Sequence, residues 1–98
     1  MTSYSVDMAA LLSPRAEILH TKRRFNLQKR IVRLSDDTFV MYRFSRKGML
    51  ERFEGTLRQV AAAGVSIQPI EARTSTFGEY MRFGHWIALG HVPGVQMA

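Results

Sequence analysis

The chain contains no cysteine, which excludes disulfides, thiolate zinc sites and a thiol nucleophile. Long hydrophobic runs are missing too, because no stretch approaches the roughly 18 apolar residues of a membrane-spanning helix. The first residues lack a basic segment followed by an apolar one, so we expect no secretory signal. We therefore expect a cytoplasmic protein, or one delivered to the cytosol of a host cell, with no membrane partner.

Motifs for catalysis, metal binding and nucleotide binding are absent from the sequence. The glycines of the C-terminal third are too dispersed to form a phosphate-binding loop. His20, His85 and His91 have no acidic or histidine partner at the helical or hairpin spacing that a metal site would need. The sequence thus predicts no cofactor, no metal and no enzymatic activity.

Negative charge is scarce over a long segment, because no carboxylate lies between Glu17 and Asp36. Within that segment, six of the twelve residues from Lys22 to Arg33 are Lys or Arg, and the whole chain carries a net charge of +6. Such a field attracts polyanions or acidic protein surfaces. Eleven of the 14 cations are arginine, whose planar fork suits phosphate and carboxylate and stacks on bases. Codon bias in a GC-rich genome would produce the same enrichment.

The length and the ordinary globular composition predict one domain of the α+β class spanning residues 1–98. We expect a helical N-terminal segment over 1–24, with a second short helix beginning at Pro14 and ending near Arg23. A β-hairpin over 25–44 and an amphipathic helix over 46–63 follow, and the helix packs on a sheet of about three to five strands. Residues 65–92 are expected to form strands, or a strand and a helix.

The helix over 46–63 is the clearest element, because its apolar residues form one stripe at about 100° per residue. Ser45 is expected to cap its start, and Gly64 is expected to end it in a left-handed conformation. On the polar side, Glu54 is expected to form an ordinary surface pair with Arg58.

The hairpin is expected to pair Leu34 with Phe39, which places Arg30 opposite Arg43. The face that includes Leu34 and Phe39 is apolar near the turn, and we expect the helix over 46–63 to cover it. The other face mixes cations with aromatic rings, a combination that suits single-stranded nucleic acid if the rings are exposed. Its members are Lys29, Arg33, Tyr42 and Phe44. If N-terminal helices cover this second face, the two aromatic residues belong to the core instead.

The basic cluster predicts a small non-enzymatic binding protein, and a nucleic-acid-binding regulatory module is the first hypothesis. The alternative is a protein-binding adaptor or inhibitor, of the size that mobile elements encode, which docks on an acidic partner surface. The residues expected to contact either partner are Lys22, Arg23, Arg24, Lys29, Arg30, Arg33, Tyr42, Arg43, Phe44, Arg46 and Lys47.

The aromatic C-terminal third offers a candidate interface for a homodimer or for another protein. Its central residue is Trp86, accompanied by Phe83 and Tyr80, because tryptophan is favoured at interface hot spots. A lone tryptophan in a chain of this size is, however, more often part of the core.

Overall fold

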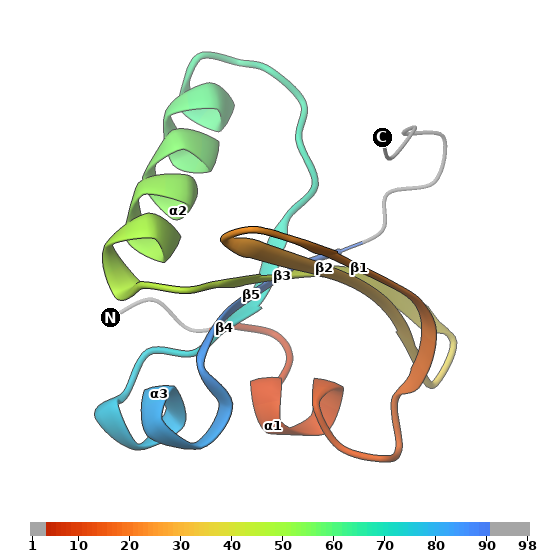
Figure 1. The fold of residues 1–98 in the computed structure, drawn as a ribbon. Helices are drawn as coiled ribbons and strands as arrows, with labels where there is room; N and C mark the ends of the chain where they lie inside the picture. The colour runs from red at the N-terminus through yellow and green to blue at the C-terminus, as the bar shows by residue number, and fades with distance from the viewer. Residues whose placement is uncertain (1–3, 91–98) are drawn as a thin grey trace.

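The structure is a computed structural model that describes residues 4–90, and it consists of one sheet with helices on both faces (Figure 1). The five strands are all antiparallel to their neighbours and follow the order β1-β2-β3-β5-β4. This is the α+β class in a single domain, as the sequence predicts. The elements in chain order are α1 (Met8–Leu11), β1 (Glu17–Arg24), β2 (Leu27–Leu34), β3 (Asp37–Phe44), α2 (Lys47–Ala62), β4 (Ile70–Arg73), α3 (Phe77–Phe83) and β5 (His85–Gly90).

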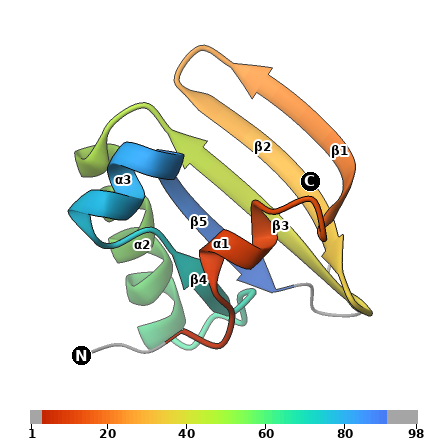
Figure 2. The ribbon, with the colours of Figure 1, turned by 90° about the horizontal axis from the view of Figure 1, so that it is seen from below.

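Each face of the sheet has its own hydrophobic core. On one face, α2 packs Leu50 over Ile87 and Leu89 of β5, and all three side chains are buried. On the other face, Met8 and Leu11 of α1 join a larger cluster contributed by β2, β3, β4 and β5. Figure 2 shows the β1–β2 hairpin projecting past the helices on that side. Among the helices within residues 4–90, none is long and apolar enough to cross a membrane.

The predicted helix from Pro14 to Arg23 is wrong, because this segment contains β1 instead. β1 pairs with β2 through a tight turn, with Arg24 opposite Leu27. All eight of its residues are exposed, so the strand buries neither face. A strand of this kind carries no alternation of apolar and polar residues, and its pairing with β2 decides its conformation. The predicted N-terminal helices are therefore reduced to α1.

The hairpin over residues 25–44 has a tighter turn than predicted, which shifts its register by two residues. Leu34 pairs with Asp37 and Val32 pairs with Phe39, so Ser35 and Asp36 alone form the turn. Ser35 adopts a φ of 56°, in the left-handed region that non-glycine residues seldom enter. Because the shift is two residues, each side chain keeps its predicted face but gains a new cross-strand partner.

The helix α2 covers the face opposite to the predicted one. The apolar face with Val32 and Phe39 packs against α1, and α2 lies over the face that carries Tyr42 and Phe44. Both rings contact Phe53 of α2, with ring centroids 5.4 Å and 5.3 Å away. The two aromatic residues are therefore half-buried beneath α2.

The ends of α2 match the prediction only in part. Gly64 takes a φ of 88° just past the C-terminus, which confirms the predicted left-handed position. At the N-terminus the cap is Arg46, and no side chain within residues 4–90 caps this end. The hydroxyl of Ser45, the predicted cap, instead contacts the sulfur of Met49.

The segment after α2 contains a strand, a helix and a second strand, so it combines features of the two predicted alternatives and matches neither of them fully. A reciprocal capping box between Thr76 and Glu79 begins α3. The backbone hydrogen bond from Ser75, helped by that from Thr76, holds the pKa of Glu79 below its ordinary value, although burial acts to raise it. Residues 91 and 92, which the prediction includes, lie outside the described residues, as does His91.

Glu54 is buried rather than a surface residue, and it connects three separate parts of the fold. Its carboxylate pairs with Arg73 of β4 and accepts hydrogen bonds from Arg58 at 3.2 Å and from the Tyr4 hydroxyl at 3.0 Å. Arg73 in turn donates to the Tyr80 hydroxyl at 3.0 Å. Burial acts to raise the pKa of Glu54, but the Tyr4 hydrogen bond and the charges of Arg73 and Arg58 outweigh it and lower the pKa.

Candidate nucleic-acid interface

The cations gather at the end of the sheet where β1 turns into β2. In the last row, Arg24 pairs with Leu27, which pairs with Phe44 of β3. The next row, on the other face, runs Arg23, Gln28 and Arg43. We call this region the basic end, and it comprises Lys22, Arg23, Arg24, Lys29, Arg30, Arg43, Arg46 and Lys47. The structure thus brings together every cation of the predicted site except Arg33.

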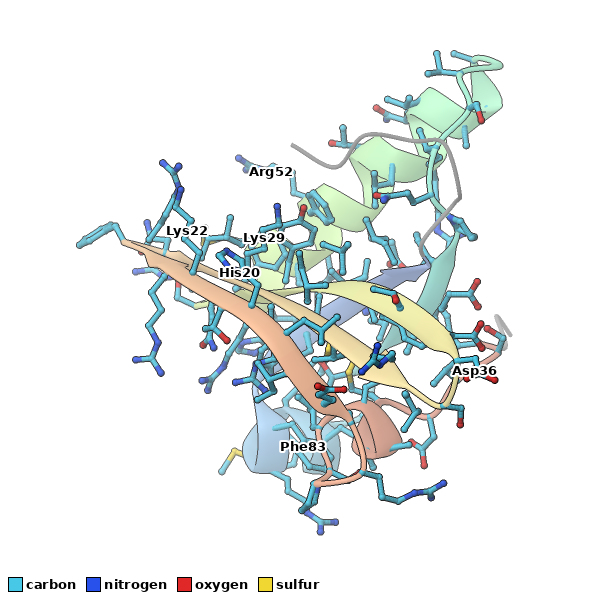
Figure 3. The ribbon with its side chains drawn as sticks, turned by 90° about the vertical axis from the view of Figure 1, so that its right-hand side faces the viewer. His20, Lys22, Lys29, Asp36, Arg52 and Phe83 are labelled. Carbon is cyan, nitrogen blue, oxygen red and sulfur yellow. The ribbon has the colours of Figure 1, made fainter. Side chains whose placement is uncertain are left out.

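Carboxylates lie at the other end of the sheet. Asp36 lies in the β2–β3 turn, Asp37 is the first residue of β3, and both share a pocket with Glu71. Arg33 belongs to this end, where it pairs with Glu17 across β1 and β2. Figure 3 shows Asp36 and Lys22 at opposite ends of the sheet. The charge along the sheet is therefore segregated, with a positive end and a negative end.

Three arginines of the basic end lie close together on the face that α1 and α3 cover. Arg30 lies diagonally between Arg23 and Arg43, with its guanidinium carbon 5.0 Å from the ring centroid of Trp86. Burial lowers the pKa of Arg30, and the positive charges of Arg23 and Arg43 lower it further. Within residues 4–90, no carboxylate pairs with any of the three. An anion between these groups would relieve their mutual repulsion.

A pocket of about 460 Å³, which we call the end pocket, opens at the basic end. Gln28 forms part of its wall although this side chain is only 9% exposed. The amide nitrogen of Gln28 has no hydrogen-bond partner in the part of the chain that the structure describes. The other walls come from arginines, rings and small polar side chains, chiefly Arg23, Arg24, Asn26, Arg43, Phe44, Ser45, Tyr80 and His85.

Gly84 holds one wall of the end pocket close to Arg43. It takes a φ of 92°, and a Cβ at this position would lie 2.6 Å from the Nε atom of Arg43. The positive φ favours glycine at this position, and a larger residue would also push the end of the Arg43 side chain aside. Sequence analysis missed both Gly84 and Gln28. The correct register of the predicted hairpin would have placed Gln28 opposite Arg43, and only the pairing of β1 with β2 adds Arg23 on the other side.

The opposite face of the hairpin carries further cations. Lys22, Arg24 and Lys29 line a smaller pocket of about 210 Å³ beside Leu27 and Tyr42. Figure 3 shows Lys22 and Lys29 on the same side of the sheet as Arg52 of α2. The hairpin therefore presents positive charge on both of its faces.

Phe25 occupies the turn at the tip of this basic hairpin. Its side chain is 99% exposed, so it contributes almost nothing to the core. It follows Arg24 directly in the sequence, and Asn26 completes the turn. Sequence analysis did not identify Phe25, because a turn residue belongs to no helical or strand periodicity from which its exposure could be predicted.

The start of α2 adds two more charges to the basic end. Arg46 and Lys47 lie where the helix dipole is already positive, and the first turn contains no acidic residue to compensate. The Lys47 amine lies 5.5 Å from the ring centroid of Tyr80, which also lines the end pocket. These groups extend the positive field beyond the hairpin.

The aromatic residues predicted for binding take more buried positions. Tyr42 and Phe44 lie partly beneath α2, so they do not form an open stacking platform. Trp86 is 3% exposed, and its indole N–H donates to the Phe83 carbonyl at 2.8 Å. Of the two alternatives for Trp86, an interface or the core, the structure supports the core. The exposed apolar residues of this region are instead Phe77 and Met81.

Other kinds of site find no support within residues 4–90. No group of three or more His, Asp or Glu side chains there could hold a metal ion. Comparisons with protein-family models, with curated proteins and with solved structures find no match. The fold and the charge distribution thus define the class of this protein as a small α+β domain with a basic end, and the proposals below rest on its geometry.

Proposed function

We propose that this protein binds nucleic acid through its basic end, as a small non-enzymatic regulatory module. The observation that carries the proposal is the segregation of charge along the sheet. Eight cations surround the β1–β2 turn, whereas the carboxylates near the β2–β3 turn lie at the far end. Phosphate contacts by Lys and Arg supply most of the sequence-independent affinity for nucleic acid, so such an end fits a polyanion.

The shape of the basic end supports the same proposal. The hairpin projects from the rest of the fold, with cations on both faces and Phe25 at its tip. Cations can therefore contact phosphates on two sides while the exposed ring stacks on a base. Arginine predominates among these cations, and its fork binds phosphate in a bidentate manner.

Binding should depend strongly on salt concentration, because each phosphate contact releases a counterion. If the basic end contacts about five phosphates, the logarithm of the association constant should fall against that of salt with a slope of about −4 to −5 on duplex DNA. Fluorescence anisotropy on protein freed of bound nucleic acid would measure the slope. A flat salt response would contradict the proposal.

Replacing the exposed ring with Phe25→Ala should weaken binding to an oligonucleotide by roughly 10-fold, because stacking on an aromatic ring contributes about 1–3 kcal/mol per base. The melting temperature should not change, since the ring is 99% exposed. Phe77→Ala is the matched control, because Phe77 is 78% exposed but lies on α3. Equal affinities of the two variants would show that the tip does not contact a base.

The exposed outer strand favours a second candidate function, the docking of an acidic protein. β1 is an edge strand, and an extended peptide can add to such an edge through backbone hydrogen bonds. Retention on a heparin or DNA column that nuclease treatment of the lysate abolishes would favour nucleic acid. Recovery of one acidic protein at moderate salt, from a nuclease-treated lysate, would favour the docking function.

A further inference from the structure

We infer that the end pocket receives one unpaired nucleotide of the bound strand. Its phosphate lies over Gln28, between Arg23 and Arg43. Its base lies against Phe44 and Tyr80. This inference rests on the proposed function and deepens it, since it names the form of nucleic acid that the basic end prefers. It predicts a preference for single strands over duplexes of the same sequence.

A phosphate-binding site can form on the row of cross-strand partners Arg23, Gln28 and Arg43. The three residues are consecutive cross-strand partners on β1, β2 and β3 and therefore point to the same face. Strands are about 4.8 Å apart, so the two arginine backbones lie roughly 10 Å from each other with Gln28 between them. Two guanidinium forks can thus approach one anion from opposite sides.

The buried amide of Gln28 is the feature that a merely basic surface does not explain. Its nitrogen is a donor without a partner within residues 4–90, although the side chain is only 9% exposed. A buried polar group without a hydrogen bond destabilises the free protein. The nitrogen itself is buried, so the side chain must turn towards the pocket before a phosphate oxygen or a base edge accepts its hydrogen bond. Arg23 and Arg43 would then neutralise the phosphate.

The remaining wall of the end pocket suits a base. Phe44, Tyr80 and His85 line it, and the rings of Tyr80 and His85 lie 5.1 Å apart between centroids. The pocket volume of about 460 Å³ falls within the usual range for small-molecule sites, which leaves room for a base beside its phosphate. A base can enter such a concavity only when it is unstacked and unpaired, so a duplex must first give up a base pair.

The test compares Gln28→Leu with the unmodified protein on a single-stranded oligonucleotide and on its duplex. We expect the unmodified protein to prefer the single strand by about 10-fold, the effect of one hydrogen-bonded and stacked base. Gln28→Leu should lose most of this preference while keeping its salt-dependent binding to the duplex. The matched control is Gln68→Leu, because Gln68 also has an unpartnered amide nitrogen within the described residues but lines a different pocket beside α2.

The outcomes separate this inference from the proposed function. Equal affinity of the unmodified protein for both strands, or an unchanged preference in Gln28→Leu, would overturn the nucleotide pocket alone. The absence of salt-dependent binding to either form would overturn the proposed function as well. If adenosine monophosphate binds as tightly as the oligonucleotide, the pocket serves free nucleotides and the inference fails.

A measurement on the unmodified protein keeps the test decisive if Gln28→Leu does not fold. In isotope-labelled protein, the side-chain amide signals of Gln28 should shift when the single-stranded oligonucleotide is added, and those of Gln68 should not. Shifts confined to Lys22 and other residues of the opposite face would place the strand elsewhere and overturn the inference.

Discussion

The double variant Arg23→Glu/Arg43→Glu is expected to bind nucleic acid at least about 100-fold more weakly than the unmodified protein. Each of the two residues should lose a charge-assisted hydrogen bond to phosphate, worth about 1.5–3 kcal/mol, and each new carboxylate repels the backbone. The salt dependence should also become shallower, since fewer counterions are released. Anisotropy titrations at several salt concentrations would measure both effects.

The control for this variant is Arg15→Glu/Arg33→Glu, which changes the net charge by the same amount at the other end of the sheet. Arg33 lies beside Glu17, and Arg15 precedes β1. We expect this control to lose only the small affinity that follows from total charge. Equal losses in the two double variants would show that the basic end is not a distinct site.

In the absence of nucleic acid, Arg23→Glu should increase the stability of the folded protein. Arg23→Glu alone places a carboxylate beside Arg30, whose pKa is lowered by burial and by the neighbouring charges of Arg23 and Arg43. Because these groups are partly exposed to solvent, the gain in unfolding free energy should be only roughly 0.2–1 kcal/mol. A gain in stability together with a loss of affinity is typical of residues kept for binding rather than for folding.

Glu54→Gln is expected to reduce the free energy of unfolding by about 3 kcal/mol, because it leaves Arg73 without a counter-charge in a mostly buried position. The Arg73 side chain is 14% exposed and that of Glu54 is 11% exposed. Urea denaturation followed by the fluorescence of Trp86 would measure the change. Glu51→Gln is the matched control, since Glu51 lies on α2 one turn away and is exposed.

The pH dependence of stability should change in the same variant. Although burial opposes it, the Tyr4 hydrogen bond and the charges of Arg73 and Arg58 lower the pKa of Glu54 from its ordinary 4.5. The folded protein therefore stabilises the ionised carboxylate more than the unfolded chain does. This contribution to the free energy of unfolding is fully present above pH 4.5, the ordinary pKa of the group. It is lost as the pH falls below 4.5 through the lowered pKa of the folded state. Identical acid profiles for Glu54→Gln and the unmodified protein would contradict this role of Glu54.

Sequence patterns predicted the elements whose apolar residues are periodic. The helix over 46–63 was placed to within a residue at each end, because Leu50, Phe53 and Leu57 form one stripe that packs on the sheet. The hairpin was located for a similar reason, since β3 carries aromatic and β-branched residues. Its register was not predictable, because it depends on the single backbone conformation of Ser35.

The outer strand and the choice of sheet face could not be predicted from local patterns. β1 buries no face, so its sequence has no periodicity to detect. The face that α2 covers depends on α1, which contributes only a few residues but supplies Met8 and Leu11 to the opposite core. Packing between distant segments decides such choices, and pattern analysis does not describe it.

The candidate site was predictable in its charge but not in its shape. The cluster from Lys22 to Arg33 was correctly identified as the dominant positive segment, yet its last residue, Arg33, belongs to the negative end. The end pocket depends on Arg43, Gln28 and Gly84, which come together only through strand pairing and the α3–β5 junction. No spacing in the sequence indicates that these three residues are neighbours.

The exposed edge of β1 has a consequence for the behaviour of the protein in concentrated solution. Edge strands are templates for adding further strands, and natural proteins protect them with bulges and charged side chains. β1 has a register irregularity between Ile18 and His20, and it carries Lys22, Arg23 and Arg24 towards its end. Repulsion between these charges opposes the stacking of one copy on another, so the cations that attract a polyanion also protect the free protein from fibrous self-assembly.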